Sequence, residues 1–370
     1  MKRLLICFLV AFLWLPIKAD ALSVSAKSAV VINGDNGEII YSKNADQKMP
    51  MASTTKIMTG LLLCEYGNFE RQITVTAEML RVEGSSMGLL AGDKVTLHDL
   101  LYGLMLASGN DAANVIAFTV GGTLDGFVKM MNEKAKELGL KNTSFETPSG
   151  LDGENHYTTA YELAILTRYA MQNEDFAKAV SCESATLNYG NPPYRRTLTN
   201  HNKLLKMYDN AVGVKTGFTK KSGRCLVSAA KSNGKYVIAV TLNAPSDWSD
   251  HKVMLDYGLS SIKQTHCSPP AESYNIPVVN GEKESLTVKA TNYVVNSLDA
   301  ENITCEVFLP QFLYAPVGAG DTVGSVVYSQ NGKTLASIPI KAGNDIQLCK
   351  TQKDLLTTIF DNIKSILVNI

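Results

Sequence analysis

The sequence predicts an α+β fold: an antiparallel sheet with surrounding helices, then a small all-β C-terminal domain and a terminal amphipathic helix. Three observations lead to this prediction. Strand-like segments lie near residues 29–44 and 211–242, and a long helical region separates them. From about residue 268 to 350, short alternating strands occur without a helical period. Strands and helices segregated in this way are typical of α+β domains.

The composition excludes several classes of protein. Of the 370 residues, 45% are hydrophobic and 19% are charged, so the chain is too apolar for disorder and long enough for two domains. Basic and acidic residues number 35 each, which leaves no basic footprint for a nucleic acid. The histidines are scattered, and neither C-x-x-C nor H-E-x-x-H occurs. We therefore expect no nucleic-acid partner, no metal and no other cofactor.

The first residues have the pattern of a signal peptide. Lys2 and Arg3 precede an apolar run from Leu4 to Leu15, and Ala19-Asp20-Ala21 is an A-x-A cleavage signature. An uncleaved membrane anchor is the alternative, but the apolar run is short for a span. We expect residues 1–21 to be removed and the mature chain to be exported. Among the six cysteines that remain, Cys64 and Cys225 lie in apolar runs and are expected to be buried free thiols.

Two hairpins define the sheet of the first domain, residues 22–267. The stretch AVVINGDNGEIIYSKN contains a turn at residues 34–37. Much later, AVGVKT and CLVSAAK are followed by an Asn233-Gly234 turn and by KYVIAVTL. Because Asn-Gly strongly favours a two-residue hairpin, these segments predict neighbouring strands that pair with the N-terminal hairpin.

Three threonines mark helix starts between these hairpins: Thr96, Thr123 and Thr159. Thr96 and Thr159 are followed three residues later by Asp99 and Glu162, which is the spacing of a capping box.

A second domain is predicted for residues 268–350. After the Ser-Pro-Pro run at 268–270, the segments SLTVKA, CEVFLP, SVVYS and ASIPIK alternate as strands do.

The last segment, residues 351–370, is predicted to form an amphipathic helix. Because it contains Asp361, Asn362 and Lys364, it should lie on a surface and not cross a membrane. Its apolar face consists of Leu355, Leu356, Ile359, Phe360, Ile363, Ile366, Leu367 and Ile370.

Chemistry is suggested first by Ser53-Thr-Thr-Lys56, an S-x-x-K match. On a helix, positions three apart share a face, so the lysine amine can reach the serine hydroxyl. Burial with Lys215 nearby can lower the pKa of Lys56 and make it a general base. The alternative is that Ser53 is only an N-cap and Lys56 is solvated.

Three further S-x-x-K matches are set aside by their predicted settings. Ser228 and Lys231 lie on a strand, where positions three apart face opposite sides. Ser232 and Lys235 flank a hairpin turn, and Ser260 is expected to follow the sheet near the domain boundary.

Two more motifs lie in predicted structural settings that suit a catalytic site. Ser108-Gly-Asn110 falls between two predicted helices, where a hydroxyl and an amide can point inward. Lys215-Thr216-Gly217 ends a predicted strand, and the missing side chain at Gly217 lets a peptide approach the strand backbone. Each motif alone also fits an ordinary polar turn or a protected edge strand.

Together, these motifs resemble those of the low-molecular-mass penicillin-binding proteins, the serine-type D-alanyl-D-alanine carboxypeptidases. The resemblance covers essentially the whole chain and implies a β-lactamase/D,D-peptidase-like fold. Flanking residues match as well, in the stretches PMASTTKIMTGLLLCE, GSSMGLLAGDKVTLHDLLYGLMLASGNDAANVIA, NEKAKELGLKNTSFETPSGLDGENHYTTAYELA and VGVKTGFTKKSGRCLVSAA.

The resemblance implies the catalytic roles. Ser53 attacks the penultimate D-alanyl carbonyl and forms an acyl-enzyme, while Lys56 accepts the hydroxyl proton. Ser108 relays the proton to the leaving D-alanine, and Asn110 orients Lys56 and the substrate amide.

It also implies a binding strand. Lys215 supplies positive potential, Thr216 contacts the terminal carboxylate, and the backbone N–H groups of Ser53 and Phe218 form an oxyanion hole. Some relatives have histidine where this chain has Phe218, and some have a carboxylate-binding arginine on the following sheet edge. No arginine follows Arg224 here, so Arg224 is the candidate for that cation.

By this resemblance the substrate is the pentapeptide stem of peptidoglycan, and β-lactam antibiotics are covalent inhibitors. The enzyme would act outside the cytoplasm, attached through the C-terminal helix to the outer face of the cytoplasmic membrane. Two alternatives stay open. A class A β-lactamase would need a deacylating glutamate, for which Glu146, Glu154 and Glu162 are candidates. A non-catalytic wall-binding protein would keep the pocket without an activated serine.

Overall fold

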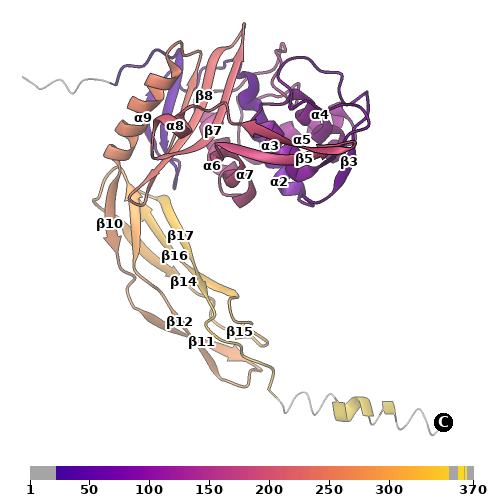
Figure 1. Cartoon of the computed structure of the whole chain (residues 1–370). Coiled ribbons are helices and arrows are strands. Elements are labelled where there is room, and N and C mark those ends of the chain that lie inside the picture. The colour runs from indigo at the N-terminus through magenta and orange to yellow at the C-terminus, as the bar shows by residue number, and fades with distance from the viewer. Residues whose placement is uncertain (1–21, 350–356, 362, 365–370) are drawn as a thin grey trace, which may run out of the picture. The chain divides into compact units, whose positions relative to one another are not determined.

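The computed structural model describes residues 22–349, 357–361, 363 and 364, which divide into two compact units (Figure 1). The first unit comprises the chain up to Val31 together with Tyr41–Ala230 and Ile238–Tyr257. The second comprises Ile32–Ile40, Lys231–Val237 and the chain from Gly258 onward.

A five-stranded sheet with the order β2-β1-β9-β8-β7 is central to the fold. Both hairpins expected from the sequence are present, and β1 is buried at every position. Because β7 is the last strand in this order, one of its edges is open for pairing. The strands are β1 (Ser28–Asn33), β2 (Ile39–Lys43), β7 (Ala211–Thr219), β8 (Gly223–Ser232) and β9 (Lys235–Leu242).

Helices lie on both sides of this sheet, α9 on one side and α2 to α7 on the other (Figure 1). The predicted α+β class, with an antiparallel sheet among helices, is therefore confirmed. The helices are η2 (Ala52–Thr55), α2 (Lys56–Tyr66), α3 (Leu97–Met105), α4 (Asn110–Gly121), α5 (Leu124–Glu137), α6 (Ala160–Ala170), α7 (Glu174–Ser181), α8 (Leu204–Met207) and α9 (Asp247–Ser261).

The three threonine caps are present. Thr96 and Asp99 form the complete capping box at α3, and Thr123 accepts a hydrogen bond from Gly126 N at α5. Thr159 caps α6 through Glu162 N. The Glu162 carboxylate does not complete a box, because it accepts hydrogen bonds from Asn142 N and the Thr143 hydroxyl instead.

Some elements were not expected from the sequence. A second antiparallel sheet has the order β3-β4-β5-β6, and two of its strands are three residues long, too short to show alternation. Helix α9 exposes Val253 and Tyr257, so its apolar residues do not follow one stripe. Ser260 follows the sheet near the boundary between the two units, as expected, and lies within α9. The strands are β3 (Gln72–Thr74), β4 (Lys94–Thr96), β5 (Ser184–Gly190) and β6 (Pro193–Thr199).

The second unit is rich in strands around its own apolar core, as predicted for the C-terminal region. Three small sheets have the orders β10-β13, β12-β11-β15 and β14-β16-β17. Their core includes Ile276, Leu286, Val326 and Ile346. The strands are β10 (Lys263–Cys267), β11 (Ser273–Val279), β12 (Ser285–Lys289), β13 (Tyr293–Ser297), β14 (Thr304–Phe308), β15 (Leu313–Tyr314), β16 (Thr322–Gln330) and β17 (Lys333–Lys341).

Both chain ends are described only in part. The predicted signal peptide, residues 1–21, lies outside the described residues. Of the predicted terminal helix, residues 357–361, 363 and 364 are described as helical, and Ile359, Phe360 and Ile363 are exposed. Within the described ranges, no helix is long and apolar enough to cross a membrane. Cys64 and Cys225 are buried free thiols, as expected.

His251 connects α9 to the five-stranded sheet. The ring is fully buried, with Nδ1 hydrogen-bonded to the Ser228 hydroxyl and Nε2 at 2.9 Å from Thr241 Oγ1. Burial lowers the pKa of His251 to about 3, so the folded chain keeps this imidazole neutral. Because its hydroxyl is hydrogen-bonded to the buried His251 ring, Ser228 has a structural role and is not a nucleophile.

We predict that His251 contributes to acid unfolding. As pH falls from 6.5 toward 3, the unfolded chain protonates this histidine but the folded chain does not, so stability is lost across that window. His251→Gln keeps a donor and an acceptor without titrating. Thermal melts between pH 7 and 4 should therefore show a smaller loss for this variant, by on the order of a few kcal/mol. His98→Gln, at an exposed histidine of α3, is the control. Equal acid sensitivity of wild type and His251→Gln would contradict the account.

Candidate active site

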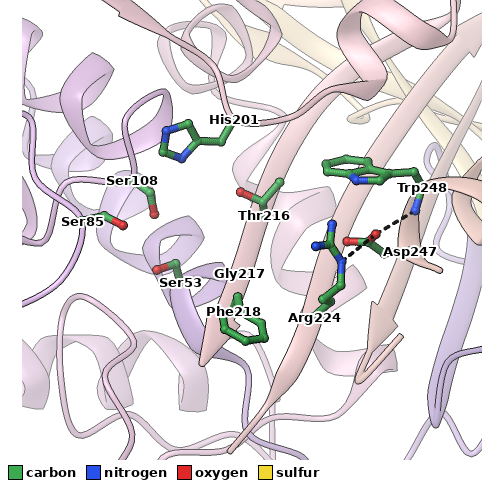
Figure 2. A pocket seen from close by; sticks show the side chains of 10 residues that line it. All are labelled: Ser53, Ser85, Ser108, His201, Thr216, Gly217, Phe218, Arg224, Asp247 and Trp248. Atoms are coloured by element: carbon green, nitrogen blue, oxygen red, sulfur yellow. Dashed lines mark hydrogen bonds and ion pairs between the residues drawn. The ribbon is translucent and has the colours of Figure 1, made fainter. Parts of the chain in front are cut away.

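A cavity of about 320 Å³ opens beside the first turn of α2 and the edge strand β7 (Figure 2). It brings together four of the residues expected from the sequence, Ser53, Ser108, Thr216 and Gly217, with Phe218 at its wall. The remaining lining residues are Ser85, His201, Arg224, Asp247 and Trp248.

Ser53 and Lys56 lie at the junction of η2 and α2. Ser53 is half-buried in the short 3₁₀ turn, and Lys56 is the first residue of α2. Lys56 is fully buried, and its Nζ lies 2.9 Å from Ser53 Oγ. The three-residue spacing therefore places amine and hydroxyl in contact, as the helical geometry predicted.

The Lys56 amine has two further partners. Its Nζ lies 2.7 Å from Asn110 Oδ1 and 2.6 Å from the Ser149 carbonyl oxygen. Asn110 Nδ2 donates to the Glu83 carbonyl at 2.6 Å, which fixes Oδ1 toward the lysine. Because Asn110 Oδ1 and Ser149 O can only accept, a neutral amine gives them its two hydrogens. Its lone pair is then left for the Ser53 hydroxyl.

The surroundings favour this neutral form. Burial lowers the pKa of Lys56 well below 10.5, and the positive charge of Lys215 lowers it further. Asp111 acts in the opposite direction, but it is the smallest of the three effects. The amine is thus suited to accept a proton.

Ser108 and Asn110 lie at the break between α3 and α4, as expected. Ser108 is buried and has a left-handed backbone with φ of 55°, which ends the path of α3 before Asn110 begins α4. Asn110 N donates to the Ser85 carbonyl at 2.7 Å. The break therefore also holds the loop that contains Ser85.

The Asp111 side chain also holds the loop that contains Ser85. Its carboxylate accepts hydrogen bonds from the backbone N–H groups of Met87, Gly88 and Leu89 at 3.0 to 3.1 Å. Three backbone donors on one buried carboxylate make a strong anchor. The loop is thereby fixed where Ser85 reaches the cavity.

The other wall is the end of β7. Lys215 is buried, its Nζ donates to the Thr216 carbonyl at 3.0 Å, and burial lowers its pKa to about 7. A Cβ built on Gly217 would lie 3.0 Å from Ser53 N and 3.1 Å from Met51 O. A side chain at this position would therefore press β7 away from η2 by a few tenths of an ångström. Phe218 is 66% exposed, so its side chain does not fill the site.

Arg224, the candidate cation named from the sequence, lies on β8 and lines the same cavity. Its Nε is 3.0 Å from Asp247 Oδ1, and its guanidinium stands 5.7 Å from the Trp248 ring centre (Figure 2). Asp247 and Trp248 begin α9, and His201 precedes α8. Sequence reasoning missed these three residues because they belong to no motif and their elements were not predicted.

Neither the serines of the other three S-x-x-K matches nor the three candidate glutamates line the cavity. The Glu162 carboxylate is engaged by Asn142 and Thr143, and Glu146 Oε2 accepts from Asn155 N at 3.0 Å. Glu154 is exposed and lines no part of the cavity. Across the residues that the structure describes, no cluster of histidine, cysteine, aspartate and glutamate could hold a metal ion.

Comparison with known proteins identifies the family. Residues 16–246 match the family model described as D-alanyl-D-alanine carboxypeptidase, and residues 270–348 match that of the penicillin-binding protein 5 C-terminal domain. D-alanyl-D-alanine carboxypeptidase DacF of Bacillus subtilis is 33% identical, over 94% of this chain and 95% of its own length.

Two solved structures support the same family. The D-alanyl-D-alanine carboxypeptidase DacD of Francisella tularensis has a TM-score of 0.64 at 28% identity, covering 90% of this chain and 97% of that one. The Streptomyces K15 DD-transpeptidase has a TM-score of 0.62 at 33% identity, covering 64% of this chain and 98% of its own. The chain therefore belongs to the D-alanyl-D-alanine carboxypeptidase family, the serine hydrolases of the low-molecular-mass penicillin-binding type.

Proposed function

We propose that this chain is a serine-type carboxypeptidase that removes the terminal D-alanine from peptidoglycan pentapeptides through an acyl-enzyme on Ser53. One observation carries the proposal. The Lys56 amine is fully buried 2.9 Å from Ser53 Oγ, and its other two partners are acceptors. A solvated lysine beside a helix-capping serine would show neither the burial nor this set of contacts.

In the acylation step, the Ser53 hydroxyl transfers its proton to Lys56 as Oγ bonds to the penultimate D-alanyl carbonyl carbon. The backbone N–H groups of Ser53 and Phe218 stabilise the oxyanion that forms. The close approach of Gly217 to Ser53 N supports this role, because it brings β7 beside the nucleophile.

Release of D-alanine needs the proton at the leaving nitrogen. Ser108, buried at the cavity wall, relays it from Lys56, and Asn110 keeps the amine oriented. Water then attacks the ester under base catalysis by Lys56, which regenerates Ser53.

Substrate recognition uses the open edge of β7. Thr216 hydrogen-bonds the terminal carboxylate, and Lys215 adds a positive charge behind it. A pKa of about 7 leaves Lys215 partly protonated near neutrality, and a bound carboxylate favours the charged form. Arg224 is the second cation at this end of the cavity, although Asp247 already neutralises part of its charge.

β-Lactams acylate the same serine in this proposal. Hydrolysis of that adduct as in a class A β-lactamase would need a glutamate in the cavity, and none of the three candidates lines it. The positions of Glu146, Glu154 and Glu162 thus favour a peptidase over a β-lactamase.

We extend the proposal to location and domain organisation. Residues 1–21 direct export, 22–267 form the catalytic domain, 268–350 the β-rich domain and 351–370 a membrane-surface helix. The exposed Ile359, Phe360 and Ile363 support the last of these, because one helix then presents apolar side chains to its surroundings.

We predict that Ser53→Ala abolishes covalent labelling by penicillin and lowers D-alanine release from a pentapeptide by about 10⁴-fold or more, because the nucleophile is gone. Mass spectrometry of the labelled chain and a D-alanine assay measure both effects. Ser260→Ala, which removes a hydroxyl from the other helical S-x-x-K serine, is the matched control and should retain both activities. Label on Ser228, Ser232 or Ser260 would refute the assignment.

A second prediction concerns the tail. Deleting the residues after Lys350 should move the mature protein from the membrane fraction to the soluble fraction and leave pentapeptide hydrolysis within twofold of wild type. Because Lys353 and Lys364 are balanced by Asp354 and Asp361, binding to vesicles should depend little on anionic lipid. Loss of folding or catalysis on deletion would show that the tail belongs to the fold.

A further inference from the structure

The Ser149 carbonyl, which accepts a hydrogen bond from Lys56, belongs to a segment without helix or strand. This segment comprises residues 145–156, which we call the Ser149 loop. Two side chains of α2 contact it: Lys56 Nζ lies 2.6 Å from Ser149 O, and the Thr59 hydroxyl donates to the Pro148 carbonyl at 2.5 Å. Because a loop lacks the hydrogen-bond ladder that fixes a strand, side-chain contacts must hold its carbonyl groups in place.

His156, at the end of the Ser149 loop, connects the loop to η2. The imidazole is 3% exposed, and its Nδ1 accepts a hydrogen bond from the Glu146 backbone N–H at 3.0 Å. Because a backbone N–H can only donate, Nδ1 carries no proton, and the ring proton is on Nε2. Nε2 lies 2.7 Å from Thr55 Oγ1 and therefore donates to the threonine hydroxyl. Thr55 is fully buried and immediately precedes Lys56.

The surroundings of His156 keep the ring in this singly protonated form. Burial lowers the pKa of His156 to about 4. Among the charged groups around the ring, Glu146 and Asp152 raise this pKa and Lys221 lowers it, but burial is the largest effect. At neutral pH the imidazole thus has one acceptor and one donor, and both are used.

Two glycines let the loop close around this contact. A Cβ built on Gly150 would lie 2.9 Å from Thr55 Oγ1, and a Cβ on Gly153 would lie 3.3 Å from His156 Cβ. The loop is therefore packed against the threonine hydroxyl at one point and against the histidine at another. Because Ser149 immediately precedes Gly150, a shift of this packing would also move the Ser149 carbonyl.

We infer that His156 positions the catalytic lysine: it fastens Thr55 to the backbone of the Ser149 loop and thereby keeps the Ser149 carbonyl beside the Lys56 amine. His156 lines no part of the catalytic cavity, so it acts through Thr55 and Ser149 and not on the substrate. The inference rests on the proposed role of Lys56 as the base.

Loss of this connection should change the charge state of Lys56. Burial is the largest of the effects that lower the Lys56 pKa, the Lys215 charge is the second, and Asp111 opposes both. A loosened Ser149 loop would admit water to the amine, so the pKa should rise toward 10.5. One amine hydrogen would also lose its acceptor, and the lone pair would no longer be held toward Ser53. Acylation should therefore slow, and its pH profile should move.

The test measures the rate constant of penicillin acylation by the mature chain between about pH 5 and 10. Thr55→Val removes the acceptor of the imidazole proton, and His156→Leu removes both hydrogen bonds of the ring. We expect each variant to shift the acid limb of the profile upward by about one pH unit, which lowers the rate at pH 7 about tenfold. The acid limb reports Lys56, which must lose a proton, whereas Lys215 must keep one and affects the basic limb.

Steady-state kinetics on a pentapeptide provide a second measurement. Because the binding strand β7 is unchanged in both variants, kcat should fall while KM stays within about twofold of wild type.

A conservative variant and a matched control separate positioning from stability. His156→Gln carries an acceptor and a donor on one amide, so it should return the acid limb toward that of wild type. His251→Leu removes another buried imidazole, which contacts the hydroxyls of Ser228 and Thr241. This control should lower the melting temperature and leave the acid limb where it is.

The outcomes distinguish this inference from the proposed function. A wild-type acid limb in Thr55→Val would overturn the inference, and this variant decides the question if His156→Leu does not fold. Equal shifts in His156→Gln and His156→Leu would also overturn it, because the donor and acceptor would then not matter. A wild-type chain that is not acylated by penicillin and releases no D-alanine would overturn the proposed function and, with it, the inference.

Discussion

The buried amine of Lys56 has three hydrogen-bond partners, a hydroxyl, a side-chain amide oxygen and a backbone carbonyl, and none of them carries a negative charge. An ammonium group in such a place is strongly disfavoured, so the amine gives up its proton more readily than in water. Every other feature of the site depends on this, because a protonated lysine could not activate Ser53. The three partners come from η2, from the start of α4 and from the loop before Gly150.

Separate contacts hold each of these segments in place. The Asn110 side chain donates a hydrogen bond to the Glu83 carbonyl. The loop at Gly150 packs so closely against η2 that a Cβ on Gly150 would lie 2.0 Å from the Ala52 carbonyl oxygen. The edge strand β7 is brought against η2 by the absence of a side chain at Gly217. Lys215 enters the same interior and further disfavours a charge on Lys56. The arrangement is thus a preorganised base beside a nucleophile, with a strand edge ready for a peptide.

Much of this could be predicted from local sequence. The helix caps at Thr96, Thr123 and Thr159 and the Asn233-Gly234 turn depend on a few neighbouring residues, and the structure contains them all. The contact between Ser53 and Lys56 follows from helical spacing alone. By contrast, Ser149 and Glu83 act through backbone carbonyls, which no residue pattern reveals. His201 reaches the cavity from the segment before α8, and Trp248 from the start of α9; neither helix has an amphipathic period long enough to predict it.

The charge state of Lys56 can be measured directly. Lysine labelled with ¹³C at Cε and ¹⁵N at Nζ gives a resonance whose pH titration reports the amine pKa, and Lys56→Met identifies the signal. The account predicts a midpoint well below 10.5, moving upward in Lys215→Met because a neighbouring positive charge is removed. A midpoint near 10.5, unchanged by Lys215→Met, would show that Lys56 is an ordinary ammonium at neutral pH and would contradict its role as the base.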